Sequence, residues 1–299
     1  MPQQNTYYET ARGRFFVRDT GRALPPLVML HGWPESSYCW EALVPLLSTT
    51  FRLIRPDLRG MGDSERTLDR KAYLKTELAQ DMLVLLQQME VDTFGLVGHD
   101  WGGVVAQEMA LAAPERIRAL ALLNIIVINN APGMAAAMER LKKYGATTSW
   151  YQTFQQQDHL AEAMIPGNEE VWLSHFLRLA KKKPFPQDAK QEYVRTFKIP
   201  GTATTSANYY RTQYEDMQRW RTLPGQKFKM PGLYLHGQRD IVIIPEYHLG
   251  FADCFEAEAR VISLDEGHFI QEEDPEGVAQ ALSGFFGKYT PGLNRITTK

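Results

Sequence analysis

The chain has 299 residues, of which 44% are hydrophobic, a composition sufficient for one large domain with a sizeable buried core. Its 33 basic and 35 acidic residues give a formal net charge of −2, which disfavours nucleic-acid or membrane-surface binding and favours small-molecule partners. The two cysteines, Cys39 and Cys254, are too far apart in sequence for a zinc motif or a disulfide framework and indicate free thiols.

No targeting or membrane segment is predicted from the sequence. Residues 1–14 are polar and lack the apolar centre of a signal peptide. The longest apolar run, residues 119–128, is interrupted by Asn124 and is too short to span a bilayer. These features, together with free thiols, predict a cytoplasmic protein, either a monomer or a homodimer.

The first part of the chain alternates between strand-like and helix-like runs. Residues 7–19 combine aromatic and β-branched residues around a central turn, which predicts a hairpin at the antiparallel edge of a sheet. Further strands are predicted at residues 27–30, 51–54 and 94–99, and helices at residues 38–47, 74–89 and 104–113.

The same alternation returns near the C-terminus. Strands are predicted at residues 117–123, 232–236 and 260–264, with a closing helix at residues 275–286. Strands that alternate with helices favour the α/β class, with a mostly parallel central sheet flanked by helices.

The segment from residue 129 to residue 225 differs from the rest, because it has helical runs but no convincing strand. Its predicted helices are at residues 134–144, 169–179 and 208–220. We interpret it as a helical lid inserted into a core formed by residues 1–128 and 226–299. Loops at the carboxyl ends of parallel strands surround the ligand crevice, so the lid is expected to roof the site.

The strand predicted at residues 94–99 ends in the sequence Gly-His-Asp-Trp-Gly, residues 98–102, and a helical run follows at once. This Gly-x-Asp-x-Gly pattern is typical of a nucleophile elbow, in which glycines avoid a clash where strand and helix crowd together. The usual elbow carries serine and performs acyl transfer. Asp100 is instead ionised at neutral pH and needs no base to attack, which favours displacement at saturated carbon.

A nucleophile that forms an ester needs a base to direct water at the ester and an acid to orient that base. His268 follows the last predicted strand and Asp240 follows the strand before it, so the chain order is nucleophile, acid, histidine. Glu266 is the nearest rival for the acid, but its closeness to His268 in sequence favours a role in the turn. His31 and His99 lie within turn motifs, where they are expected to order loops by hydrogen bonding.

Five short motifs occur in a fixed order along the chain. They are His31-Gly32-Trp33-Pro34-Glu35-Ser36, Pro56-Asp57-Leu58-Arg59-Gly60-Met61-Gly62-Asp63-Ser64, Gly98-His99-Asp100-Trp101-Gly102-Gly103, Gly237-Gln238-Arg239-Asp240 and Gly267-His268. Together they resemble the α/β-hydrolase fold family, and within it the branch of soluble epoxide hydrolases and dehalogenases that uses an aspartate nucleophile. The likeness covers nearly the whole chain and implies the α/β-hydrolase fold with its inserted lid.

The resemblance also implies an oxyanion hole formed by the backbone N–H groups of Trp33 and Trp101, which would steady the negative oxygen that develops when water attacks the ester. It further implies a cis peptide bond before Pro34. In some relatives the acid follows the strand after the elbow helix, at a position that here corresponds to Asn124. Because an amide cannot carry the charge that stabilises an imidazolium, Asp240 is the expected acid.

Two stretches of the predicted lid, residues 150–155 with 160–162 and residues 208–211, resemble the tyrosine-bearing stretches of epoxide hydrolases. The resemblance implies that Tyr151 and Tyr210 donate protons to the oxygen of an opening epoxide. The expected reaction converts a small-molecule epoxide and water to a vicinal diol, with no cofactor and no metal. The side chains expected to line the substrate pocket are Trp33, Trp101, Trp150, Phe154 and Phe269.

Two alternatives stay open at this point. A haloalkane or haloacetate dehalogenase would use the same attack by Asp100, and the indole of Trp101 beside the nucleophile could contact the halide. Against it, haloalkane enzymes commonly carry Asn where Trp33 stands, and fluoroacetate enzymes usually carry Arg where Trp101 stands. The other alternative is a binding protein of this fold that retains the pocket but hardly turns over.

Overall fold

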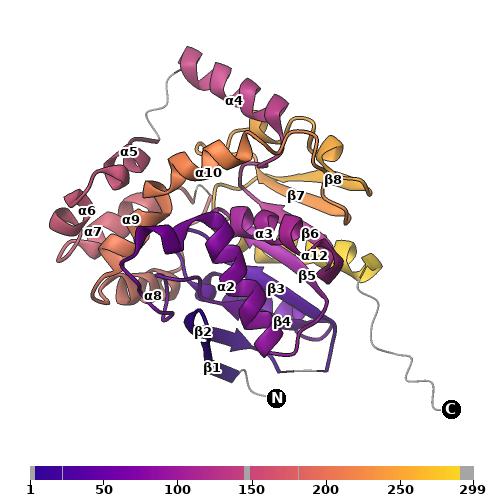
Figure 1. Ribbon diagram of the computed structural model, residues 1–299, viewed down its shortest axis with the longest axis horizontal. Coiled ribbons are helices and arrows are strands. Elements are labelled where there is room, and N and C mark those ends of the chain that lie inside the picture. Colours follow the sequence, from indigo (N-terminus) through magenta and orange to yellow (C-terminus); the bar gives the residue numbers. More distant parts are fainter. Residues whose placement is uncertain (1–3, 22, 145–148, 181, 290–299) are drawn as a thin grey trace.

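The centre of the computed structural model, which describes residues 4–21, 23–144, 149–180 and 182–289, is an eight-stranded sheet (Figure 1). Its strands are β1 (Gln4–Thr10), β2 (Gly13–Asp19), β3 (Pro26–Leu30), β4 (Arg52–Pro56), β5 (Phe94–His99), β6 (Ile117–Leu123), β7 (Gly232–Gly237) and β8 (Ala259–Leu264). They lie in the order β1-β2-β4-β3-β5-β6-β7-β8. The pairs β1–β2 and β2–β4 are antiparallel and the others are parallel, which confirms the predicted sheet and its edge hairpin.

The burial of the strands follows their place in the sheet. Every residue of β5 and β7 is buried, whereas the edge strands β1 and β8 are largely exposed or half-buried. Central parallel strands are apolar on both faces because helices cover both sides of the sheet. The strand that precedes Asp100 is thus among the most deeply packed elements of the molecule.

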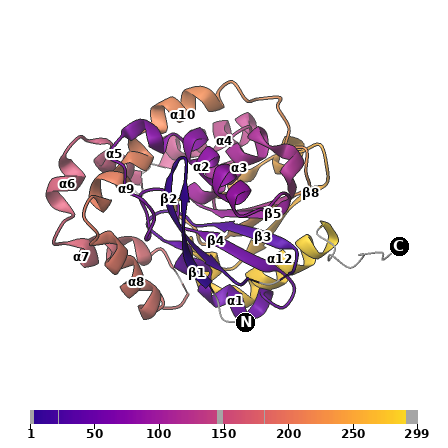
Figure 2. The same cartoon turned by 60° about the horizontal axis from the view of Figure 1, so that its bottom comes forward.

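Helices cover both faces of this sheet. Figure 2 shows α2 (Lys75–Gln88) and α3 (Trp101–Ala112) on one side, and α1 (Val44–Leu47) with α12 (Pro275–Tyr289) on the other. The predicted apolar face of α2 is buried, because Leu78, Met82, Leu85 and Leu86 recur at helical spacing and all pack into the core.

One helix predicted in the core has a different form. The segment expected to be helical at residues 38–47 consists of a 3-10 helix, η1 (Ser37–Leu43), followed by the single turn of α1. Pro45 lies in the first turn of α1, where its missing N–H does no harm, whereas inside a longer helix it would remove a hydrogen bond. The other short helices are η2 (Arg70–Tyr73), η3 (Pro114–Arg116), η5 (Pro245–His248), η6 (Phe251–Cys254) and α11 (Ile270–Glu273).

Between β6 and β7 the chain leaves the sheet and, in its described part, forms helices and no strand. We call residues 129–225 the inserted segment. Its helices are α4 (Ala131–Tyr144), α5 (Trp150–Gln156), α6 (Leu160–Met164), α7 (Glu169–Leu177), α8 (Gln187–Phe197), α9 (Thr202–Arg211) and α10 (Gln213–Trp220). Figure 1 shows α5 to α9 gathered at one end of the sheet.

The predicted helices of the inserted segment are only partly correct. Residues 134–144 and 169–179 correspond to α4 and α7, but residues 208–220 span two helices that are separated at Thr212. The helices α5, α6 and α8 were not predicted. α5 and α6 have only seven and five residues, whereas α8 has eleven and buries Ala189, Tyr193 and Phe197 at helical spacing, so its pattern was overlooked. The boundaries of the lid at residues 129 and 225 stay a prediction.

The described residues include no helix that is long and apolar enough to cross a membrane. Cys39 and Cys254 are both buried and form no disulfide, as the sequence indicated.

Candidate active site

Asp100 lies in the tight turn between β5 and α3 and has a φ of 47°. This left-handed conformation is rare for residues other than glycine, so the turn holds strained backbone at the predicted nucleophile. A Cβ on Gly98 would lie 2.5 Å from the carbonyl oxygen of Gly102, so no larger side chain fits where the strand meets the helix. The strand-turn-helix predicted from the glycine pattern is therefore present, and Asp100 lines a cavity.

The loop after β3 brings a backbone donor to this carboxylate. The N–H of Trp33 donates to Oδ1 of Asp100 at 2.8 Å. The approach is close, since a Cβ on Gly32 would lie 2.5 Å from the Cβ of Asp100. The second predicted oxyanion donor, Trp101, is the first residue of α3, where an N–H has no partner within the helix. The peptide bond between Trp33 and Pro34 is cis, as expected.

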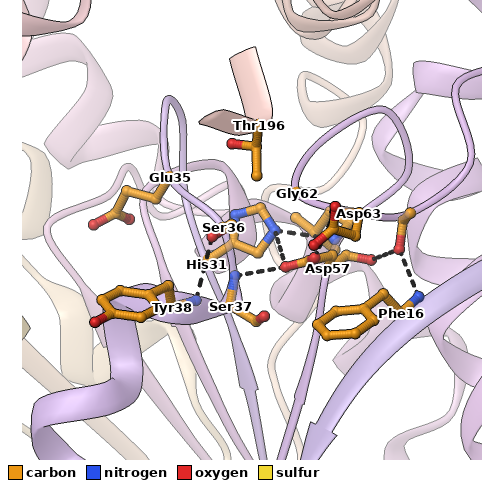
Figure 3. Close-up of polar contacts among 12 residues, drawn as sticks. Phe16, His31, Glu35, Ser36, Ser37, Tyr38, Asp57, Gly62, Asp63 and Thr196 are labelled. Carbon is orange, nitrogen blue, oxygen red and sulfur yellow. Dashed lines mark hydrogen bonds and ion pairs between the residues drawn. The ribbon is translucent and has the colours of Figure 1, made fainter. Parts of the chain in front are cut away.

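The buried carboxylate of Asp57 ties the loop after β3 to the loop after β4 (Figure 3). Its Oδ1 accepts a hydrogen bond from the Ser37 N–H and its Oδ2 accepts one from the Asp63 N–H, both at 2.7 Å. His31 joins the same loops, because its Nε2 accepts from the Leu58 N–H at 3.0 Å. The predicted role of His31 in loop order agrees with these contacts, which hold in place the loop that carries the Trp33 donor.

His268 lies between the two predicted carboxylates. Its Nδ1 is 2.7 Å from Oδ2 of Asp240, a hydrogen-bond distance. Its Nε2 is 3.7 Å from Oδ2 of Asp100, an ion-pair separation with room for a small movement. Asp240 is itself held by the backbone, since its Oδ1 accepts from the N–H groups of Val242 and Ile243 at 2.7 and 3.1 Å. The structure thus brings together three side chains that are far apart in sequence.

The electrostatics of these three groups are linked. Burial alone would lower the pKa of His268, but the charges of Asp240 and Asp100 raise it well above its ordinary value. Burial alone would likewise raise the pKa of Asp100, but His268, His99 and the Trp33 N–H lower it. Both shifts favour the charged forms of His268 and Asp100.

Neither rival for the acid contacts the His268 ring. Glu266 faces away, and its Oε1 accepts from Nζ of Lys182 at 3.1 Å. The Nδ2 atom of Asn124 donates to the carbonyl oxygens of Gly267 and His268, each at 2.9 Å, and its Oδ1 accepts from the Gly237 N–H at 2.8 Å. Asn124 thus joins the loops that carry the acid and the base, and Asp240 alone supplies a charge to Nδ1.

A buried polar group behind His268 was not recognised as a unit from the sequence. Nε2 of His99 is 2.9 Å from the carbonyl oxygen of His268, and Nδ1 of His99 is 2.8 Å from Oε2 of Glu35. Gln271 donates to Oε1 of the same Glu35 at 2.7 Å. These contacts hold the His268 backbone from behind, in line with the loop-ordering role predicted for His99. The partners come from separate segments, so only their place in turn motifs could have hinted at them.

Tyr151 on α5 and Tyr210 on α9 line the same cavity as Asp100. Both are buried, and their ring centroids are 5.7 Å apart at an angle of 83°. Burial raises the pKa of both phenols above the ordinary value, and the charge of Asp100 raises it further. Both hydroxyls therefore keep their protons at neutral pH and are available as donors to a group bound in the cavity.

The cavity next to Asp100 has a volume of about 500 Å³ and a mostly apolar lining. Its wall combines loops of the sheet with helices α4, α5, α9 and α10 of the inserted segment. Apolar contributors include Ile125, Met134, Met138, Met217, Val242 and Ile243. None of these was predicted, because they come from separate parts of the chain and no local pattern distinguishes them from core residues.

Of the five predicted pocket residues, only Trp101 lines this cavity. The ring of Trp33 stacks on Tyr151 at 5.5 Å, so its backbone faces the site while its side chain lies behind a tyrosine. Trp150, which is 46% exposed, and Phe154 pack against Trp172 instead.

Phe269, also expected in the pocket, packs on Phe185 and on the rings of His99 and His268. These four side chains do not line the cavity next to Asp100, and they share one feature. Aromatic side chains bury large areas and cluster with one another, so they form core as readily as a pocket wall.

No group of three or more His, Cys, Asp or Glu side chains with metal-binding geometry occurs in residues 4–289, leaving aside positions 22, 145–148 and 181.

The fold agrees with comparisons to known proteins. A family model described as the alpha/beta hydrolase fold matches residues 25–275. The chain is similar to a soluble epoxide hydrolase of Corynebacterium sp. (strain C12), with 28% identity over 276 residues that cover 87% of this chain and 90% of that protein. It is also similar to a fluoroacetate dehalogenase of Burkholderia sp., with 25% identity over 290 residues that cover 92% of this chain and 91% of that protein.

Two further matches concern length and structure. The chain is 27% identical over 285 residues to the bifunctional epoxide hydrolase 2 of Rattus norvegicus, a match that covers 86% of this chain but 51% of that longer protein. A solved structure of an epoxide hydrolase without ligand has a TM-score of 0.80 and 27% identity, covering 96% of this chain and 99% of that chain.

Proposed function

The chain belongs to the α/β-hydrolase fold family, and from this premise we propose that it is an epoxide hydrolase that forms an ester on Asp100 and releases a vicinal diol. The observation that carries the proposal is the pair of buried tyrosines, Tyr151 and Tyr210, in the same cavity as the Asp100 carboxylate. An epoxide gives a strongly basic alkoxide when it opens, and protonated phenols can donate to that oxygen.

In the first step one oxygen of Asp100 attacks an epoxide carbon from the side opposite to the breaking C–O bond. The hydrogen bond from the Trp33 N–H holds the carboxylate in place for this attack. Tyr151 or Tyr210 gives its proton to the departing oxygen, which becomes the first hydroxyl of the product. Asp100 loses its negative charge as the ester forms.

That loss of charge prepares the second step. One of the two carboxylates that raise the pKa of His268 is gone, so the imidazolium gives up its proton more readily and restores the proton that the tyrosine gave. Neutral His268, oriented by Asp240, then accepts a proton from water as the water attacks the ester carbonyl. The Trp33 and Trp101 N–H groups stabilise the negative oxygen of the intermediate, and its collapse releases the diol.

Dehalogenation is the second candidate, because Trp101 lines the cavity beside Asp100 and an indole can contact a halide. The similarity to a fluoroacetate dehalogenase also keeps this reaction under consideration. A halide needs no proton, however, so two buried tyrosines would have no acid function in that reaction. The tyrosine pair therefore favours the epoxide.

The test is to incubate the purified protein with aryl and alkyl epoxides, haloalkanes and fluoroacetate, and to measure diol and halide release together. The Asp100→Asn variant is the matched control for background hydrolysis. Diol release that depends on Asp100 is expected. Halide release without diol would establish the dehalogenase instead. Binding of epoxides, seen as a change in tryptophan fluorescence, with neither product would indicate a binding protein.

A further inference from the structure

Lys75, the first residue of α2, is completely buried and has no part in the proposed mechanism. Its Nζ donates to Oδ2 of Asp216 at 2.8 Å, to the carbonyl oxygen of Tyr209 at 2.8 Å and to Oγ1 of Thr212 at 2.9 Å. A buried ammonium is costly unless it is paired and hydrogen-bonded. Lys75 meets this requirement with three residues of the inserted segment, and with one longer contact of 3.4 Å to the carbonyl oxygen of Tyr73 in the core. The burial of Lys75 does not serve the stability of α2, since a cation at a helix N-terminus opposes the helix dipole.

These contacts enclose Tyr210 in sequence. Tyr209 precedes it, and Thr212 is the residue at which α9 gives way to α10. The last carbonyls of a helix lack partners within the helix, and the Tyr209 carbonyl near the end of α9 receives the ammonium of Lys75. A cation is also favourable at the C-terminal end of a helix. Lys75 thus holds the chain on both sides of Tyr210, by a backbone carbonyl at Tyr209 and by a side-chain hydroxyl at Thr212, where α9 ends.

A further contact of Lys75 connects it to the Tyr210 ring through Trp101. Nζ of Lys75 lies 4.3 Å from the centroid of the Trp101 indole. The Trp101 and Tyr210 rings meet edge to face, with centroids 5.4 Å apart at 80°. The ammonium therefore acts on Tyr210 through its backbone and through the ring that packs against its phenol. Asp216 offsets part of the charge, but the ammonium is the member of the pair that contacts the indole.

We propose that Lys75 is the positioning residue for Tyr210, holding the break between α9 and α10 and the Trp101 indole so that the Tyr210 hydroxyl meets the oxygen that leaves the epoxide. The inference rests on the proposed function, because it assigns Tyr210 a proton to give. A proton donor must lie within hydrogen-bond reach of the oxygen it protonates, so a small shift of the Tyr210 backbone weakens the donation.

A second ion pair allows the positioning role of Lys75 to be compared with a purely structural one. Arg219 of α10 and Glu108 of α3 form a second ion pair between the inserted segment and the core, with Nη2 and Oε2 2.8 Å apart. If Lys75 only anchored the inserted segment, the Arg219→Met variant would have the same kinetic effect. If Lys75 positions Tyr210, only the loss of Lys75 should slow the step that needs the tyrosine proton.

The main variant is the double substitution Lys75→Met and Asp216→Asn, which removes both charges and leaves no unpaired carboxylate in the interior. In the wild type the backbone N–H of Lys75 donates to Oδ1 of Asp216 at 3.0 Å. Asn at position 216 retains an oxygen that can accept this hydrogen bond from the backbone of residue 75. With styrene oxide in single-turnover experiments, we expect ester formation to slow on the order of tenfold, the scale of a lost buried cation–π contact. Ester hydrolysis should stay close to the wild-type rate, and Arg219→Met should change neither step.

The decisive comparison adds each tyrosine substitution. In the Tyr210→Phe background, loss of Lys75 should cause no further slowing, because the hydroxyl it positions is absent. In the Tyr151→Phe background the full effect should persist. Thr212→Val, which removes one oxygen that binds Nζ, is a milder variant and should show a smaller effect with the same dependence on Tyr210. It provides the same comparison if the double variant fails to fold.

The outcomes separate the two proposals. If the wild type forms no diol from any epoxide, the proposed function fails, and the role given to Lys75 fails with it. If the wild type forms diol but loss of Lys75 leaves ester formation unchanged, only the inference about Lys75 is overturned. Equal slowing of both steps, or equal slowing in both tyrosine backgrounds, would likewise overturn it and leave Lys75 as an anchor of the inserted segment.

Discussion

The Nε2 atom of His268 lies 3.7 Å from Oδ2 of Asp100, so the nucleophile and the proposed base share one electrostatic environment. While Asp100 is charged, it helps to keep the proton on His268 and raises the pKa of that imidazole. An ester on Asp100 removes this charge. In the proposed mechanism the base therefore becomes available only after the nucleophile has reacted.

This coupling predicts a lower pKa for His268 in the Asp100→Asn variant than in the wild type. An NMR titration of the His268 ring protons measures it, with Asp265→Asn, the loss of a carboxylate paired with Arg239, as the control. The raised pKa also stabilises the wild-type fold below about pH 6.5, the ordinary value for histidine. This contribution should disappear as the pH rises through the folded pKa of His268. An unchanged titration in Asp100→Asn would show that the two groups are not coupled.

A single turnover in heavy-oxygen water should place the label in the Asp100 carboxylate. In the proposed mechanism water attacks the carbonyl carbon of the ester, so its oxygen enters the protein and the diol receives an oxygen from Asp100. Mass spectrometry of the peptide that contains Asp100 detects the label, and protein incubated without epoxide is the control. Label that appears only in the diol would exclude the covalent route.

The His268→Gln variant should accumulate the ester. Attack by Asp100 does not need the imidazole as a base, whereas activation of water does. The intact mass of this variant should increase by one substrate molecule after incubation with an epoxide. Replacement of His159, which is exposed and does not line the cavity, should produce no such species. Normal turnover by His268→Gln would assign the base elsewhere.

Asp240→Asn should reduce ester hydrolysis on the order of ten-thousandfold, because the amide cannot stabilise the imidazolium that forms. Asn124→Ala should cost less activity but more stability, since it leaves the carbonyls of Gly267 and His268 and the N–H of Gly237 without this partner. Steady-state rates and thermal unfolding distinguish the two effects. A larger loss of activity in Asn124→Ala would mean that the charge on Nδ1 is not what matters.

Replacement of Tyr151 or Tyr210 by Phe should slow ester formation by a factor on the order of a hundred, the scale of one lost donor. The double variant should nearly abolish it, although the two effects need not add because both hydroxyls serve one oxygen. Stopped-flow measurement of alkyl-enzyme formation tests this, and Tyr247→Phe, another tyrosine that lines the cavity, is the control. Ester formation at the wild-type rate in the double variant would favour dehalogenation with Trp101 at the halide.

Local patterns were sufficient to predict the core of the fold. The strand before Asp100 and the glycines around it determine a sharp turn, because only glycine fits where β5 meets α3. The spacing of Leu78 and Met82 likewise predicts which face of α2 is buried. The single helix expected at residues 38–47 is instead a 3-10 helix followed by one α-helical turn. Pro45 fits the first turn of a helix but not the interior of a longer one.

The residues that line the pocket could not be predicted from local sequence patterns. The apolar wall next to Asp100 combines Met134 and Met138 of α4 with Met217 of α10, and nothing in their local sequence separates a wall from a core. For the same reason Trp150 and Phe154 were expected in the pocket but pack against Trp172.

The sequence by itself determined which side chains follow the ends of the strands. They are, in chain order, the carboxyl groups of Asp100 and Asp240 and the imidazole of His268. Only the tertiary structure decided which atoms meet, such as Nδ1 of His268 with Asp240 and Nζ of Lys75 with the Tyr209 carbonyl. The reason is that local pattern reports backbone preference over a few residues. Distances between side chains depend instead on how whole elements pack, and burial then decides which charges persist.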